Sequence, residues 1–107
     1  MAEFRDYSFS DLVGQTLKHV DTVIMPGKGK MVGTDAFQVF FEWGNGAKQR
    51  ITVDGAGGEP DVRRALGAAL VAEEAPVPNH GTVNVGLRFS NGLTIHLNMV
   101  GPIETDY

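Results

Sequence analysis

Apolar and polar residues alternate along two stretches of the chain, and a short polar turn interrupts each stretch once. The first stretch covers residues 37–53 with a Gly-Asn-Gly turn at 44–46, and the second covers 83–99 with a Ser-Asn-Gly turn at 90–92. A period of two is typical of strands that bury one face. The pattern therefore predicts two β-hairpins, which superpose at an offset of 46 residues (91 − 45).

The register of the second hairpin follows from which residues share a face. A two-residue Asn-Gly loop would pair Leu87 with His96 and would mix apolar and polar side chains on one face. A three-residue loop pairs Leu87 with Ile95 instead, and one face of the hairpin becomes wholly apolar. Because register is strongly specified where one face is buried, the sequence predicts the three-residue loop in both hairpins.

Each of these loops should end on a residue in the left-handed conformation. Glycine adopts that conformation without steric strain, so we expect positive φ at Gly46 and Gly92. The same register makes the first hairpin apolar on one face except at one pair, where Gln49 stands opposite Phe41.

Residues 15–25 precede the first hairpin and are rich in β-branched side chains, which favours a strand after a turn at residues 10–14. The spacing of Leu12, Leu17, Val20 and Ile24 also fits a helix, so both readings stay open for this stretch.

The segment between the hairpins carries the signals of a helix. Pro60 and Asp61 are typical of a helix start, and apolar residues then recur at helical spacing. We therefore expect a helix over residues 60–73, followed by a rigid Pro-containing loop over residues 76–81 that leads into the second hairpin.

These elements predict an α+β fold in a single domain over residues 1–107. Its antiparallel sheet would hold about five strands, made from the two hairpins and the N-terminal strand, with one helix between the hairpins. One helix of this length is too narrow to cover both apolar hairpin faces, unless the sheet curls or the hairpins face each other. Because monomers rarely leave large apolar patches exposed, the sequence predicts a homodimer.

Composition narrows the function. The 107-residue chain has a net charge of −4 and no cysteine. This balance disfavours nucleic-acid binding, which normally needs a basic surface, and permits binding to a protein. The sequence contains no apolar run long enough to span a membrane and no signal peptide, so we expect a cytoplasmic protein with no membrane association.

The residue types that carry catalysis do not form a recognisable constellation. His19, His80 and His96 have no spacing that suggests a metal site, and no nucleophile motif accompanies Ser90. We therefore expect no catalytic residues, no metal and no cofactor, and interpret the chain as a non-enzyme.

The polar faces of the hairpins supply the first candidate site. Phe40 stands among polar residues of the first hairpin, where a large aromatic side chain should be covered by the N-terminal strand, a partner or a ligand. Arginine is enriched in interfaces, so the predicted partner-binding residues are Phe40, Arg50, Arg88 and His96. They suggest a small acidic protein-binding module of the immunity, inhibitor or accessory type.

The alternative hypothesis is a binder of a small anionic ligand such as a nucleotide. Its candidate ligand-binding residues lie in two Gly-rich loops, Lys28 and Lys30 in one and Gly57 and Gly58 in the other. Backbone N–H groups of such loops attract anions, although the second loop is flanked by acidic residues and lacks the P-loop lysine.

Overall fold

The computed structural model describes residues 8–29, 33–55 and 60–106. Within these ranges, two short 3-10 turns and seven strands follow one another: η2 (Ser10–Leu12), β1 (Leu17–Met25), β2 (Ala36–Trp43), β3 (Lys48–Asp54), η3 (Val62–Ala65), β4 (Leu70–Asn79), β5 (Thr82–Phe89), β6 (Thr94–Met99) and β7 (Glu104–Asp106).

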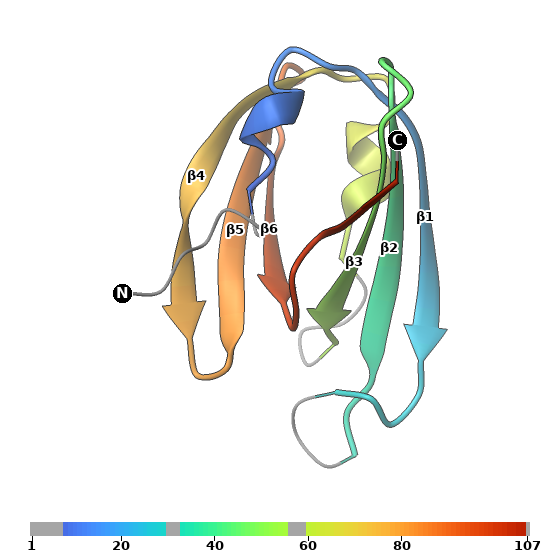
Figure 1. Cartoon of the computed structure of the whole chain (residues 1–107), viewed down its shortest axis with the longest axis vertical. Helices are drawn as coiled ribbons and strands as arrows, with labels where there is room; N and C mark the ends of the chain where they lie inside the picture. The colour runs from blue at the N-terminus through green and yellow to red at the C-terminus, as the bar shows by residue number, and fades with distance from the viewer. Residues whose placement is uncertain (1–7, 30–32, 56–59, 107) are drawn as a thin grey trace.

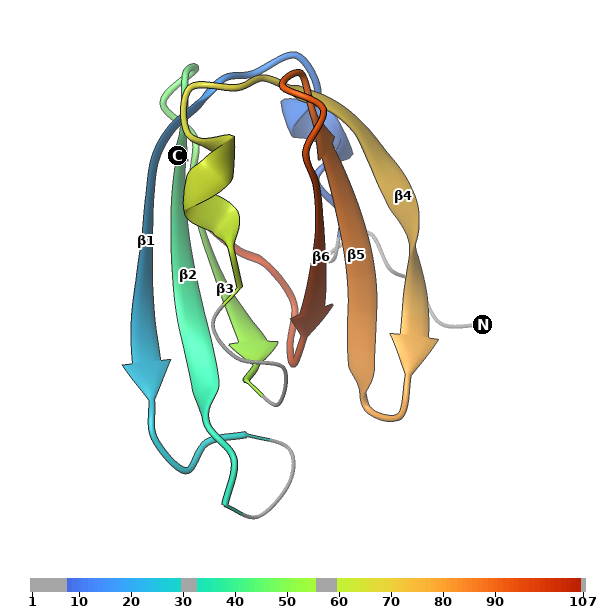
Figure 2. The same cartoon turned by 180° about the vertical axis from the view of Figure 1, so that it is seen from behind.

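The strands form one antiparallel sheet in the order β1-β2-β3-β6-β5-β4, and β7 lies beside β3. The sheet folds over, so that β1-β2-β3 and β6-β5-β4 make two layers that face each other (Figures 1 and 2). The expected α+β class is wrong, because the described residues contain strands and 3-10 turns and no α-helix.

The predicted hairpins are confirmed with their register. Leu87 pairs with Ile95 and Val39 pairs with Ile51, as the three-residue loops require. Gly46 and Gly92 have φ values of 88° and 85°. The apolar face of each hairpin is buried, which is the condition that makes a register unambiguous.

The N-terminal strand is also confirmed, as β1 over Leu17–Met25. The 3-10 turn η2 precedes it, at the position where the sequence predicts a turn.

The helix expected over residues 60–73 is wrong. Helical backbone lasts only for the single 3-10 turn η3, and Leu66 already has an extended conformation (φ −55°, ψ 130°). The backbone after it hydrogen-bonds to the start of β1: the Gly67 N–H donates to the Leu17 carbonyl at 2.9 Å. Tertiary pairing thus overrides a weak helical preference, since one turn is too short to be stable alone.

The rigid loop expected over residues 76–81 is also wrong. β4 continues to Asn79 and turns directly into β5 at His80 and Gly81. Proline is tolerated here because β4 is an edge strand of the sheet. Pro78 has no N–H to donate, and no further strand lies beside β4 to need one.

The two layers are copies of one structural unit, a 3-10 turn followed by three strands. Leu17 of β1 pairs with Trp43, and Leu70 of β4 pairs with Phe89. Both strands have a register shift immediately after that pair. The repeat therefore extends beyond the hairpins, at an offset of 53 residues (70 − 17) for the first strand of each unit.

Reciprocal hydrogen bonds join the two units where β1 and β4 begin. The Gly14 N–H donates to the Leu70 carbonyl at 2.7 Å, and the equivalent Gly67 N–H donates to the Leu17 carbonyl. A bridge between Thr16 and Ala69 lies between these bonds. In each unit, the segment before the first strand thus hydrogen-bonds to the first residue of the other unit's first strand.

The core lies between the layers, and aromatic rings run across it. Trp43 stacks on its equivalent, Phe89, with ring centroids 6.4 Å apart and an interplanar angle of 4°. Gln49, the polar residue on the apolar face, is buried and accepts a hydrogen bond from the Trp43 indole N–H at 2.9 Å. It satisfies a donor that would be costly to bury unpaired.

The apolar faces of the two hairpins cover each other inside one chain. The homodimer was predicted because one helix could not cover both faces, and no such helix exists. The argument for a homodimer therefore no longer applies, and the homodimer remains a prediction.

Replacing Gly92 by valine should lower the free energy of unfolding by about 1–2 kcal/mol, because a β-branched residue is strained at positive φ. A Cβ at Gly92 meets nothing within 4 Å, so strain alone should account for the loss. Urea unfolding measures it. Gly44→Ala is the matched control, since φ is not positive there and its Cβ would meet Thr16 only at an ordinary 3.6 Å. Equal stability of the Gly92→Val variant and the control would contradict the argument.

Candidate functional site

The outer face of β1-β2-β3 carries a compact group of aromatic and charged side chains. Asp21 pairs with Phe40, and Phe40 pairs with Arg50, which in turn pairs with Glu104 of β7. Two residues further along the strands, a second row made of His19, Glu42 and Lys48 crosses the same face. We call this surface the Phe40 face, and its residues are His19, Asp21, Phe40, Glu42, Lys48, Arg50 and Glu104.

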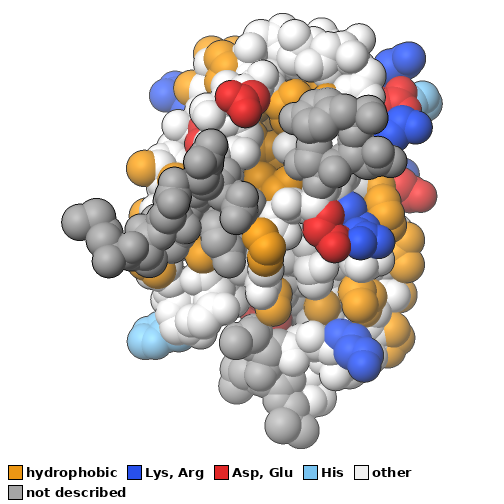
Figure 3. Space-filling view, viewed as in Figure 1, with side chains coloured by type: hydrophobic (Ala, Val, Ile, Leu, Met, Phe, Trp, Pro, Cys, Tyr) orange, Lys and Arg blue, Asp and Glu red, His pale blue; other side chains and the backbone are white. Residues whose placement is uncertain are grey.

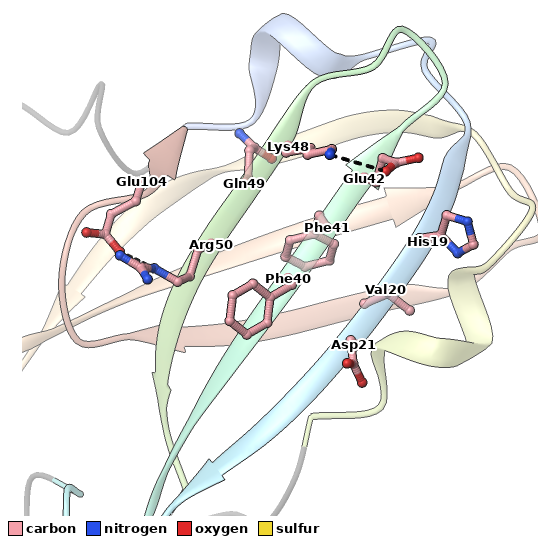
Figure 4. Close-up of a pocket in the computed structure, with 10 residues that line it drawn as sticks. All are labelled: His19, Val20, Asp21, Phe40, Phe41, Glu42, Lys48, Gln49, Arg50 and Glu104. Atoms are coloured by element: carbon pink, nitrogen blue, oxygen red, sulfur yellow. Dashed lines mark hydrogen bonds and ion pairs between the residues drawn. The ribbon is translucent and has the colours of Figure 1, made fainter. Parts of the chain in front are cut away.

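The Phe40 face is hollowed, with a volume of about 740 Å³. Figure 4 shows Phe40 near its centre, with Arg50 and Glu104 on one side and His19 and Asp21 on the other. The Phe40 side chain is 38% exposed although its strand lies in the middle of the layer.

Ion pairs surround this aromatic ring. Arg50 Nε lies 2.5 Å from Glu104 Oε2, and Arg63 Nη2 lies 3.3 Å from Asp21 Oδ1. Glu42 lies between Lys18 and Lys48, at 3.6 and 4.0 Å. The right side of Figure 3, over β1–β3, shows acidic and basic side chains beside hydrophobic ones. The Phe40 face therefore combines an apolar centre with a charged border of both signs.

The pair formed by Arg50 and Glu104 changes the titration of both groups. The hydrogen bond from Arg50 holds the pKa of Glu104 below its ordinary value of 4.5, and the charge of Arg50 adds to this effect. The hydrogen bond to Glu104, followed by its charge, raises the pKa of Arg50. Because both side chains are solvent-exposed, the pair positions β7 more than it stabilises the fold.

The second unit shows what the fold itself needs at these positions. The residue equivalent to Phe40 is Gly86, which pairs with Glu74 and His96 as Phe40 pairs with Asp21 and Arg50. A Cβ at Gly86 would lie 2.6 Å from the Glu74 carboxylate, so a side chain of the same unit occupies that space. The second unit forms the equivalent strand with glycine at this position, so the fold does not require an aromatic residue at position 40.

The four predicted partner-binding residues separate into two groups. Phe40 and Arg50 are cross-strand neighbours on the Phe40 face. Arg88 and His96 are exposed on β5 and β6, on the outer side of the other layer. The outer faces of two opposed layers point away from each other, so these four residues do not form one surface (Figures 1 and 2).

The candidate anion site falls largely outside the described residues, which do not include Lys30, Gly57 or Gly58. Lys28 is described and exposed in the connection between β1 and β2. Next to it, the Gly27 N–H already donates to the Asp35 carboxylate at 3.0 Å. A carboxylate at this position competes with any anion, and no observation here favours the anion-binding hypothesis.

The three histidines lie apart, on β1, in the β4–β5 turn and on β6. In the described part of the chain, no three His, Asp or Glu side chains gather in a group that could hold a metal ion. None of the described helical segments is long and apolar enough to cross a membrane.

Sequence reasoning missed His19, Asp21 and Glu104 as members of the site. His19 and Asp21 carry a weak signal, since they alternate with Val20 on a predicted strand and so share one face. Glu104 carries no local signal, because it reaches the site only through the pairing of β7 with β3.

Comparisons of this chain with protein-family models, with curated proteins and with solved structures found no match. The functional argument therefore depends on the geometry of the Phe40 face alone.

Replacing Arg50 by glutamine should raise the pKa of Glu104 toward its ordinary value of 4.5, because the hydrogen bond from Arg50 is its largest perturbation. A lowered pKa means that the carboxylate supports the folded arrangement above its ordinary pKa and loses this role as pH falls through the lowered value. NMR titration of the Glu104 side-chain carboxyl carbon measures the shift. A Lys28→Gln variant is the control and should leave the titration unchanged. An unaltered Glu104 titration in the Arg50→Gln variant would contradict the assigned cause.

Proposed function

We propose that this chain is a non-catalytic protein-binding module and that its partner docks on the Phe40 face. The observation that carries the proposal is Phe40 itself, a large aromatic side chain that is 38% exposed at the centre of a hollowed sheet face. Aromatic residues surrounded by a polar border are typical of the anchors that carry most interface energy.

The comparison between the two units supports this assignment. Where the first unit presents Phe40 and Arg50, the second presents Gly86 and His96 on the same backbone. Exposing an aromatic ring has no benefit for folding, and the second unit shows that the strand forms without one. The difference between the units is therefore better explained by binding than by stability.

The charges around Phe40 support a protein partner over a nucleic acid. Basic and acidic side chains alternate on this face and already form pairs with each other. A phosphate backbone selects an uninterrupted basic surface, whereas an interface between proteins commonly has a rim of mixed charge. Arg88 and His96 lie on the other layer, so we assign the contacts to Phe40 and Arg50.

Replacing Phe40 by aspartate should reduce partner capture at least about tenfold, because truncating an aromatic anchor typically costs ~2 kcal/mol or more of binding energy. The experiment compares immobilised chain variants in lysate of the source cells, with captured proteins quantified by mass spectrometry. Stability should change little, since partly exposed positions tolerate substitution within ~1 kcal/mol.

Val77→Asp is the matched control, because Val77 is an exposed apolar residue on the outer side of the other layer, with 57% of its surface accessible. The proposal requires a protein that the wild type and Val77→Asp retain equally and that Phe40→Asp loses. If both variants capture the same proteins in the same amounts, the Phe40 face is not the binding site.

A further inference from the structure

On the side away from β2, strand β3 has two different neighbours. β6 pairs with β3 only at Val53, opposite Met99, and the sheet opens beyond that point. β7 fills the opening by pairing antiparallel with Lys48–Arg50. We call the backbone of Lys48–Arg50 on the side away from β2 the β3 edge.

β7 is held lightly on this edge. It is three residues long and lies at the end of the described chain. Its first side chain, Glu104, is 59% exposed and contacts Arg50, which is 45% exposed. Ile103, just before β7, packs partly against the core and anchors the connection. Short strands with exposed contacts open at low free energy, so β7 can leave the edge while Ile103 stays in place.

The fold does not depend on β7. The segment equivalent to Lys48–Arg50 in the second unit is Thr94–His96, at the offset of 46 residues (94 − 48). Within the described ranges, Thr94–His96 pairs with β5 on one side and with no strand on the other. One unit therefore folds with this edge free, and the strand on the β3 edge is an addition.

We propose that the β3 edge is a strand-addition site, and that the partner of this chain enters it with an extended acidic segment that takes the place of β7. This proposal rests on the proposed function and specifies the chemistry of the partner. Adding a strand to a sheet edge is a common way in which proteins bind extended segments, with backbone hydrogen bonds for affinity and side chains for selectivity.

The register of β7 shows which sequence the edge selects. Arg50 stands opposite Glu104, and Lys48 stands opposite Asp106. Cross-strand neighbours of opposite charge stabilise a sheet, and two basic residues two positions apart therefore favour acidic residues at the same spacing. The expected partner segment is an acidic residue, any residue and a second acidic residue, in extended conformation.

The position of the edge explains why a partner strand would displace β7. The Phe40 face borders the β3 edge through Arg50, which pairs with both Phe40 and Glu104. A partner that lies on the edge can replace the contact of Glu104 with Arg50 and reach Phe40 as well. The two contacts on one partner reinforce each other as linked binding sites do.

The experiment titrates the full chain with a fluorescent, end-capped peptide of residues 102–106, Pro-Ile-Glu-Thr-Asp, and follows anisotropy. The variant Glu104→Gln weakens the chain's own strand, so it should bind this peptide up to about fivefold more tightly than the wild type, because the tethered competitor loses an exposed ion pair. The amide peptide Pro-Ile-Gln-Thr-Asn should bind more weakly than the acidic peptide. Arg50→Gln, combined with Glu104→Gln, should reduce that preference, and adding Lys48→Gln should remove it.

Amide NMR spectra of the Glu104→Gln variant provide the second measurement and the internal control. The acidic peptide should shift the amides of Lys48–Arg50 and leave those of the equivalent Thr94–His96 unchanged. The proposal is wrong if the peptide shows no binding up to ~1 mM, or if both peptides bind the variant equally. It is also wrong if wild type sediments as a dimer that Glu104→Gln dissociates, since a second copy's strand would then occupy the edge.

These results are independent of the capture experiment on Phe40. A partner that depends on Phe40 while the acidic peptide does not bind would overturn strand addition alone and leave the proposed function standing. Peptide binding to Lys48–Arg50 without any Phe40-dependent partner would overturn the Phe40 face as the docking surface.

Discussion

The mutual burial of two apolar sheet faces is the interaction on which the structure depends. Each three-stranded unit has one apolar face that water would otherwise contact, and burying such area is the main favourable term in folding. Trp43 and Phe89 occupy equivalent positions and stack on each other between the layers. Because each unit is covered by the other, the chain needs no helix to close its core.

A comparison of equivalent positions in the two units shows which side chains the fold requires. The inward positions keep apolar character in both copies, for example Phe41 and Leu87 at the same place. The outward positions differ strongly, as Phe40 and Gly86 do. Packing constrains the first set in both copies and leaves the second set free, so we base the functional proposal on the outward differences.

The way the two layers face each other also shapes the sheet beside the candidate site. β3 and β6 belong to opposed layers and remain paired only at Val53 and Met99, where the layers meet. An open sheet edge is available for pairing with another strand. In this chain the edge of β3 that borders Arg50 carries β7, so the same constraint that closes the core creates the edge next to the Phe40 face.

The sequence by itself determined the local elements whose cause is local. A period of two with a fixed loop length specified both hairpins, their register and the left-handed glycines. Cross-strand parity placed Phe40 opposite Arg50 or Thr52, and the structure pairs it with Arg50. Tertiary structure decided the rest. The stretch at 60–73 has helical spacing, but its backbone becomes 3-10 turn and strand because distant partners near Leu17 take its hydrogen bonds.

The full repeat was hidden because the connection between β1 and β2 is longer than the turn at His80, which changes the offset from 46 to 53 residues. The same limit applies to the site. Glu104 joins Arg50, and Arg88 lies on the other layer, through pairings between segments far apart in the chain. Alternation along a strand reports which face a residue occupies, but only the packing of the strands decides which faces meet.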